Sequence, residues 1–350
     1  MRTSIRLLVV LCVSLAALMS ANAAWAVYEP GLRVATISNS LNTPSILVVG
    51  IVQTPSDDAT AKIDIFVPEG FNEQLTATPG TTIGAVSGAV IARNLGNAEI
   101  EFQGVVRADN PATYLNNPCT RQPTPHGAVW VLEVTIAGTP FRVPLYVDNV
   151  TTIPGVSARI QVCLAGPVGT PNGTQVLRAA FAVQGVFQNP PTRGVYTFSG
   201  LFTPYVANTA TPNPAGTVES RAIVPLPVSV TLRTQRRGRR VIVSGRINLP
   251  GNAIPATVEL WTGPTARRLR RVARLRVRNN ATFSTTRRYS RRTRIQFFQV
   301  RINNGFADAS GPPFNACASP PSRAPAGCVS AWFTALDARS SVRRVRFPRR

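Results

Sequence analysis

The 350-residue sequence predicts an all-β protein built as two β-sandwich domains in tandem. Short apolar runs alternate with polar residues at a spacing of two, which is the spacing of a strand with one buried face. Turns rich in glycine, proline and asparagine separate these runs, and little sustained helical spacing lies between them. Charge then divides the chain into a near-neutral part and a strongly basic part.

The N-terminus has the features of a secretory signal peptide. Arg2 and Arg6 precede an apolar run over residues 7–19, and small residues follow it. The run is shorter than the roughly 20 residues that a membrane-spanning helix needs. We expect cleavage after Ala23, which removes residues 1–23, with cleavage after Ala26 or an uncleaved anchor as alternatives. The mature protein is therefore predicted to be secreted or associated with the cell envelope, without a transmembrane segment.

Charge marks the predicted domain boundary. Residues 24–222 contain ten basic and twelve acidic residues, whereas residues 223–350 contain 26 basic and three acidic residues. Turn-rich sequence at 211–216 and 225–227 accompanies this change. We therefore expect a β-rich N-terminal domain over 24–222 and a basic β-sandwich domain over 223–350, each long enough to bury its own core.

Alternation predicts many short strands in the N-terminal domain. The clearest pattern is a hairpin whose strands cover 130–136 and 141–147, with a turn at 137–140 between them. Residues 176–183 fit a strand, although Leu177 and Phe181 also fit one face of a helix; the flanking glycines favour the strand. Further strands are expected at 63–67, 99–103, 160–164 and 195–202.

The basic domain shows the same alternation, with arginines on the polar side. Leu275 and Val277 alternate with Arg274, Arg276 and Arg278, which a strand would direct into water. A helix over 267–278 is the alternative, but it would mix arginines with the apolar residues on one face. About seven strands are expected, beginning at 228–232 and ending at 341–347, with a basic turn at 236–240.

Four cysteines remain after signal cleavage, an even number in a chain expected to reach an oxidising compartment. Four cysteines allow three pairings. We favour Cys119 with Cys163 and Cys317 with Cys328, because each pair then stays within one predicted domain. The chain has a single histidine and no C-x-x-C motif, so neither a metal site nor a cofactor is predicted.

Several segments of the basic part carry a resemblance to a known family. They are residues 228–233, 241–246, 249–251, 258–260 and 280–284, and they resemble the bacterial immunoglobulin-like modules of secreted actinobacterial proteins. The resemblance covers about residues 223–348 and implies an immunoglobulin-like sandwich with an extracytoplasmic structural or binding role. This part departs from the antibody-type pattern, in which a cysteine pair bridges the two sheets, because Cys317 and Cys328 lie only eleven positions apart. The N-terminal part resembles the β-rich leader domain of uncharacterised secreted proteins of the same bacteria, which implies no mechanism.

The arginines of the basic domain are the candidate binding residues. A guanidinium group can bind phosphate, sulfate or carboxylate at two points, and arginines at every second strand position lie about 7 Å apart. We expect an anionic cell-envelope polymer or an acidic polysaccharide as partner. Sequence-specific nucleic-acid binding is not expected, since no recognition motif is present. The competing interpretation is a face charged only for solubility and against edge pairing. The candidate anion-binding residues are Arg236, Arg237, Arg239, Arg240, Arg274, Arg276 and Arg278.

No catalytic residue is predicted, and the protein is interpreted as a non-enzyme. His126 lies in a proline-rich, turn-like segment and is interpreted as an exposed loop histidine. Glu99 and Glu101 are interpreted as a solvated strand face. The nucleophile, phosphate-loop and dinucleotide motifs are absent from the sequence. The alternative hypothesis is a secreted hydrolase with a site around these three residues.

Overall fold

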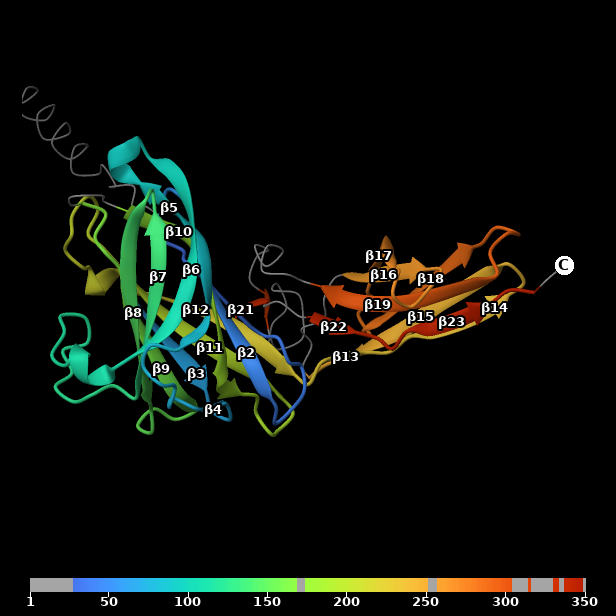
Figure 1. Ribbon diagram of the computed structural model, residues 1–350, viewed down its shortest axis with the longest axis horizontal. Helices are drawn as coiled ribbons and strands as arrows, with labels where there is room; N and C mark the ends of the chain where they lie inside the picture. The colour runs from blue at the N-terminus through green and yellow to red at the C-terminus, as the bar shows by residue number, and fades with distance from the viewer. Residues whose placement is uncertain are drawn as a thin grey trace, which may run out of the picture.

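The chain folds into antiparallel sheets, as predicted for an all-β protein. The computed structural model describes residues 28–168, 174–250, 257–303, 314–315, 330–333 and 337–348. Within these ranges, three short 3-10 helices lie between strands: η1 (Arg93–Leu95), η2 (Pro111–Tyr114) and η3 (Pro214–Gly216) (Figure 1). None of the helices in these ranges is long and apolar enough to cross a membrane. The predicted signal peptide lies outside the described residues.

The first sheet contains fourteen strands in the described part of the chain. Its order is β1-β2-β10-β5-β6-β7-β8-β9-β3-β11-β12-β21-β20, with β4 beside β10. The strands are β1 (Gly31–Thr36), β2 (Pro44–Val52), β3 (Thr60–Pro68), β4 (Asn72–Glu73), β5 (Thr82–Ala92), β6 (Ala98–Asp109), β7 (Ala128–Ile136), β8 (Thr139–Asn149), β9 (Val156–Cys163), β10 (Thr174–Gln188), β11 (Gly194–Pro204), β12 (Val218–Leu226), β20 (Phe314–Asn315) and β21 (Ser330–Phe333).

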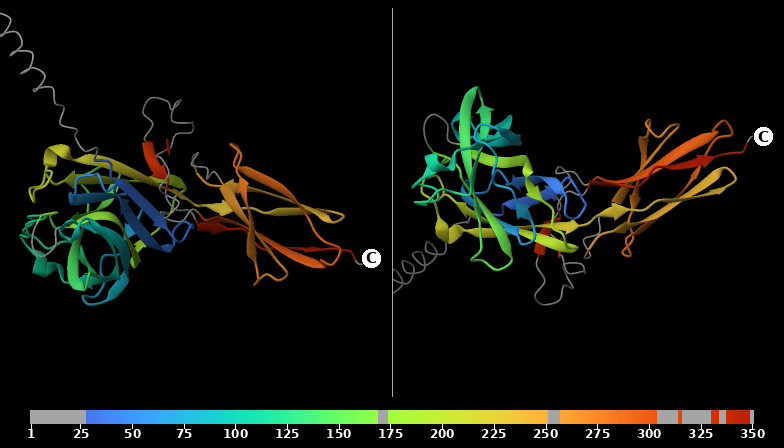
Figure 2. Two further views of the ribbon diagram at one scale, coloured as in Figure 1. Left: turned by 90° about the horizontal axis from the view of Figure 1, so that it is seen from above. Right: turned by 60° about the horizontal axis from the view of Figure 1, so that its bottom comes forward.

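This sheet curls until strands near its two ends meet. The backbone amide of Leu32 in β1 donates a hydrogen bond to Ser220 Oγ of β12 at 2.9 Å. Register shifts in β5 and β10 allow the strong bending that this requires. The views in Figure 2 show the strands wrapped around a common interior. Large apolar side chains, among them Trp130, Phe198 and Phe202, fill much of that interior and form the first hydrophobic core.

Two smaller sheets face each other in the C-terminal part. One joins β13 (Ser229–Val230), β14 (Arg233–Arg237), β15 (Arg240–Asn248) and β18 (Thr282–Arg288). The other joins β16 (Thr257–Gly263), β17 (Arg270–Arg276), β19 (Ile295–Asn303), β22 (Asp337–Arg339) and β23 (Arg343–Arg346). Their inward side chains, such as Val243, Phe283, Leu260 and Phe298, form the second hydrophobic core. Each such side chain stabilises the fold by about 1.5–3 kcal/mol when fully buried.

Most strand predictions are confirmed, and the ambiguous segments are resolved. Residues 176–183 lie within β10, and β17 replaces the helix considered for 267–278. In the predicted hairpin, Trp130 of β7 pairs with Leu145 of β8. The predicted basic turn is wrong in extent, because Arg236 and Arg237 belong to β14 and only Gly238 and Arg239 form the turn. Gly238 adopts a φ of 60°, which favours glycine there.

The predicted boundary near residue 223 lies inside a strand. β12 runs through it without interruption, and Ile223 belongs to the second core while Leu226 belongs to the first. The late segment β21 returns to pair in parallel with β12, through Ala222 and Trp332. The two parts of the chain therefore share β12, an arrangement that the charge pattern does not indicate.

One predicted disulfide is confirmed. Cys119 is bonded to Cys163, across 44 residues of sequence. The bond ties the loop between β6 and β7 to the end of β9. The predicted pair Cys317–Cys328 lies outside the described residues.

Candidate functional site

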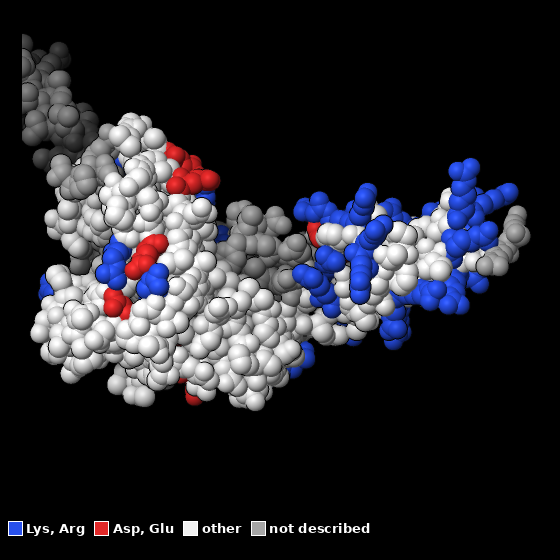
Figure 3. Space-filling view, in the orientation of Figure 1, with Lys and Arg blue, Asp and Glu red and all other residues white. Residues whose placement is uncertain are grey.

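Arginines cover the surface of the C-terminal part. Figure 3 shows Lys and Arg side chains gathered over this part, whereas the N-terminal part carries scattered charges of both signs. Residues 223–303 contain nineteen arginines and a single acidic residue, Glu259. Intramolecular ion pairs can therefore neutralise only a small share of this positive charge.

Three arginines form a row across the sheet of β14, β15 and β18. Arg237 pairs with Arg240 on the neighbouring strand, and Arg240 pairs with Arg288 on the next. Such cross-strand neighbours lie about 4.5–5.5 Å apart, and like charges directly opposite each other are destabilising. All three side chains are exposed, and no described residue forms an ion pair or hydrogen bond with them. We call these three residues the arginine row.

Apart from Ile242, the rest of this outer face is polar, and it carries no carboxylate. The next outward row, two residues from the arginine row, consists of Gln235, Ile242 and Thr286. In the row after that, Arg233 pairs with Ser244. Arg246 then pairs with Thr282. Because the sheet presents hydroxyl and amide groups between its arginines, it offers an anionic polymer both charge and neutral hydrogen-bond donors.

The opposite sheet carries a second basic face with one carboxylate in it. Arg274, Arg276 and Arg278 are exposed while Leu275 and Val277 are buried, as the alternation predicts. Glu259 of β16 lies directly opposite Arg274. This face points away from the arginine row because the two sheets enclose a common core.

Glu259 is the centre of a small polar network. Its Oε1 accepts a hydrogen bond from Arg271 Nη1 at 2.7 Å, and its Oε2 accepts one from Trp261 Nε1 at 3.0 Å. Burial by itself would raise the pKa of Glu259, but these hydrogen bonds and the charges of Arg271 and Arg274 together hold it below its ordinary value. Arg301 stacks over the Trp261 ring at 3.9 Å from the centroid. Several guanidinium groups of this face are thus already engaged.

The structure separates the predicted anion-binding residues into groups. Arg237 and Arg240 lie in the arginine row, whereas Arg236 pairs with the buried Val241 and so lies on the other face of β14. Arg239 differs from the others, because its guanidinium donates to the carbonyls of Ser290, Arg291 and Thr293 at 2.9–3.1 Å and thereby holds their loop. Its anion-binding role stays a prediction.

Sequence reasoning missed Arg288 as a member of the row. Alternation from the buried Phe283 places Arg287 on the inner side of β18 and Arg288 on the outer side. Arg287 donates to the carbonyl of Val272 at 2.8 Å. Only the pairing of β18 with β15 brings Arg288 next to Arg240, and no short stretch of sequence shows that pairing.

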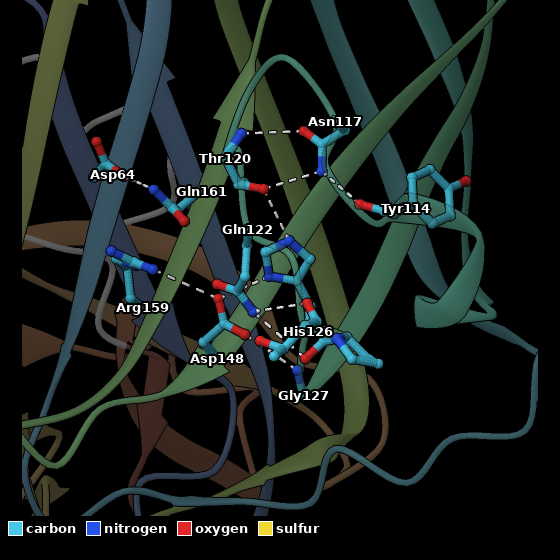
Figure 4. A network of polar contacts seen from close by, with 12 residues as sticks. Asp64, Tyr114, Asn117, Thr120, Gln122, His126, Gly127, Asp148, Arg159 and Gln161 are labelled. Carbon is cyan, nitrogen blue, oxygen red and sulfur yellow. Dashed lines mark hydrogen bonds and ion pairs between the residues drawn. The ribbon is translucent and has the colours of Figure 1, made fainter.

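His126 is buried, so its interpretation as an exposed loop histidine is wrong. Its side chain is held between two partners (Figure 4): Nδ1 lies 2.8 Å from Asp148 Oδ2, and Nε2 lies 3.0 Å from Thr120 Oγ1. Because the carboxylate only accepts, Nδ1 donates to it, and in the neutral imidazole Nε2 then accepts from the Thr120 hydroxyl. Asn117 Nδ2 donates to the same hydroxyl oxygen at 3.0 Å. Hydroxyl, imidazole and carboxylate are thus linked in series.

This network fastens the loop between β6 and β7 onto the outer face of β7 and β8. The loop buries Val129, Val131 and Tyr146, which point away from the first core. The amides of Cys119 and Thr120 both donate to Asn117 Oδ1, at 3.0 and 3.1 Å. The backbone donors next to the hydroxyl are therefore occupied, whereas an oxyanion hole needs free donors.

Glu99 and Glu101 of β6 both bind Arg178 of β10, across the strand β5 that lies between them. Arg178 Nη1 forms an ion pair with Glu99, and Arg178 Nη2 lies 3.1 Å from Glu101 Oε1. His126 is not part of this group, so the structure does not bring the three residues of the hydrolase hypothesis together. In the part of the chain that the structure describes, no cluster of His, Cys, Asp and Glu could hold a metal ion.

No protein-family model and no curated protein matches this chain. Among solved structures, it is similar to a β-1,2-glucanase from Parabacteroides distasonis, with 9% identity and a TM-score of 0.20, over 91% of this chain and 36% of that one. It is also similar to dimeric latent PorU from Porphyromonas gingivalis, with 7% identity and a TM-score of 0.18, over 89% of this chain and 34% of that one. The chain spans about a third of the length of both, and such low scores carry no conclusion about function.

Proposed function

We propose that this is a secreted or cell-surface protein with a non-catalytic binding role, whose arginine-rich C-terminal part binds an anionic polymer of the cell envelope or an acidic polysaccharide. In this proposal the chain forms two β-sandwich domains in tandem, of which the C-terminal one is immunoglobulin-like. The N-terminal sequence supports secretion, and the resemblance over residues 223–348 supports an extracytoplasmic module.

The arginine row is the observation that carries the proposal. Three exposed guanidinium groups on adjacent strands repel one another, and solubility alone does not require such an arrangement. Phosphate, sulfate or carboxylate groups bound across the row would relieve this repulsion. A polymer fits better than a single anion, because Arg233 and Arg246 continue the positive face along the sheet.

Salt-dependent binding by the full chain tests the proposal. We expect retention on immobilised polyphosphate and on immobilised hyaluronate at low salt, falling linearly with the logarithm of salt concentration. Replacing Arg237, Arg240 and Arg288 together by glutamine should lower the slope of that dependence by about 2, since each neutralised phosphate contributes roughly 0.7–0.9.

A matched variant removes the same charge from the other face. Replacing Arg274, Arg276 and Arg278 by glutamine should lower the slope less, because Glu259 already compensates part of that face. If the two triple variants lower the slope equally, binding depends on net charge alone and not on the arginine row. Retention that does not depend on salt would refute the proposal.

A hydrolase with its site in the N-terminal part remains a second candidate, and the series Thr120–His126–Asp148 favours it. Hydroxyl, imidazole and carboxylate in this order are the components of a nucleophilic relay. Turnover of ester or glycoside substrates that disappears in Thr120→Val but persists in Glu99→Gln would support this candidate. The occupied amides of Cys119 and Thr120 argue against it.

A further inference from the structure

The interior of the curled sheet is not completely filled. A hollow of about 110 Å³ lies among side chains contributed by eight of its strands. Protein interiors normally contain few voids larger than one water molecule. Valine, isoleucine, leucine and phenylalanine side chains form most of its wall, among them Ile51, Phe102, Leu132, Phe141 and Val143.

Incomplete burial of inward-facing side chains is independent evidence for an accessible hollow. Phe102, Leu132, Phe141 and Val143 belong to the wall and pack against the first core, yet each is only partly buried. Strand alternation directs them inward, where a filled core would bury them fully. Solvent-sized molecules therefore reach this apolar wall from within the sheet.

Small residues on two adjacent strands leave the space open. Ala179 of β10 lies opposite Gly88 of β5, and both face the interior in the same row as Ile51 and Phe102. A Cβ atom on Gly88 would lie 2.6 Å from Cζ of Phe102, so glycine is required for the ring to lie there. A larger residue at 179 would instead fill the hollow.

The chemistry of the wall selects the kind of ligand. None of the lining residues is charged, and the only two hydroxyl groups are those of Thr60 and Thr174. Thr60 is buried, and its hydroxyl is already hydrogen-bonded to Tyr28 and Gln53. Thr174 is half-buried and Ala165 is exposed, so the hollow reaches the surface on the side of these two residues. Ordered water needs two to four polar partners, which the apolar wall does not provide.

We infer that this hollow binds the end of an alkyl chain whose neutral polar group stays at the opening, beside Thr174. The volume is comparable to cavities of about 150 Å³ that stay dry and bind small hydrocarbons. An alkyl chain would cover the half-buried side chains, and the Thr174 hydroxyl would hydrogen-bond a hydroxyl or ester group. This inference does not depend on the proposed function of the arginines.

Calorimetric titration of the full chain with straight-chain alcohols from 1-butanol to 1-octanol tests the inference. Affinity should rise about fourfold per added methylene until the hollow is filled and then level off. Ala179→Leu should weaken binding at least tenfold. Ala180→Leu is the matched control, because Ala180 pairs with Gly50 and Ser87 and lies on the outer face of the same strand.

A second variant keeps the inference testable if Ala179→Leu fails to fold. Phe141→Ala enlarges the hollow and should move the levelling-off point to a longer alcohol. Octanoate should bind more weakly than 1-octanol, because no charged side chain lines the wall. Absence of binding, a rise without levelling off, or equal binding by Ala179→Leu and the unmodified protein would each overturn the inference.

Discussion

Arg271 Nη1 lies 2.7 Å from Glu259 Oε1, and this pair includes the only acidic residue in the first 81 positions of the basic part. Glu259 is buried, while Arg271 is half exposed. We expect Glu259→Gln to lower the free energy of unfolding by about 1–3 kcal/mol, because the nearby guanidinium groups lose their counter-charge. Urea unfolding near neutral pH measures this.

The same substitution should change the dependence of stability on pH. The pKa of Glu259 is lower in the folded protein, so its contribution is present above the ordinary glutamate pKa of about 4.3 and is lost as pH falls through the folded value. The difference between the original protein and Glu259→Gln should therefore shrink between pH 6 and pH 3. Glu219→Gln is the comparison: the pKa of Glu219 is also lowered, but its pair with Arg221 is more exposed, so the difference should shrink less. A difference that stays constant would contradict this role.

The hydroxyl of Thr120 should stabilise the loop between β6 and β7. Thr120→Val keeps the shape of the side chain but leaves Nε2 of the buried His126 without its donor. We expect a loss of about 1–3 kcal/mol in the free energy of unfolding. Thr113→Val, an exposed position in the same loop, should cost much less. Equal losses from both variants would show that His126 is not held by this contact.

Relieving the arginine row should stabilise the fold. Arg240 lies between Arg237 and Arg288, so Arg240→Gln removes two like-charge contacts. We expect the free energy of unfolding of Arg240→Gln to be about 0.5 kcal/mol higher at low ionic strength. The difference should disappear near 1 M salt, where the screening length is about 3 Å. Thermal unfolding at both salt concentrations measures the gain. Destabilisation of Arg240→Gln at low salt would mean that the three arginines do not repel one another.

The Cys119–Cys163 bond should contribute strongly to stability. It closes a loop of about 44 residues, for which the chain-entropy relation gives about 4 kcal/mol. Replacing both cysteines by serine should lower the free energy of unfolding by a comparable amount. Reduction of the unmodified protein should have a similar effect, and a loss below 1 kcal/mol would contradict the assignment.

The pairing of Cys317 with Cys328 stays a prediction. If it forms, the mature protein contains no free thiol. Mass spectrometry after alkylation without reductant should then detect no added label, and proteolysis should release peptides joined through these two cysteines. A label on either residue would refute the pairing.

Local patterns were sufficient to predict the all-β class, the hairpin of β7 and β8 and the outward position of Arg274 and Arg276. A strand alternates its side chains at every residue, so a run of a few residues already reports which side is buried. The Cys119–Cys163 pairing was also within reach, because four cysteines allow few alternatives.

Long-range pairing decided the rest. Arg288 lies next to Arg240, and so belongs to the arginine row, only because of the register of β18 against β15. Asp148 and Thr120 reached His126 because a loop folds back across β7 and β8. The hollow beside Ala179 exists because a sheet of many strands curls around its own interior. A one-residue shift in register would turn every side chain of a strand to the other face. No short stretch of sequence indicates either the register of two strands or the curvature of a sheet.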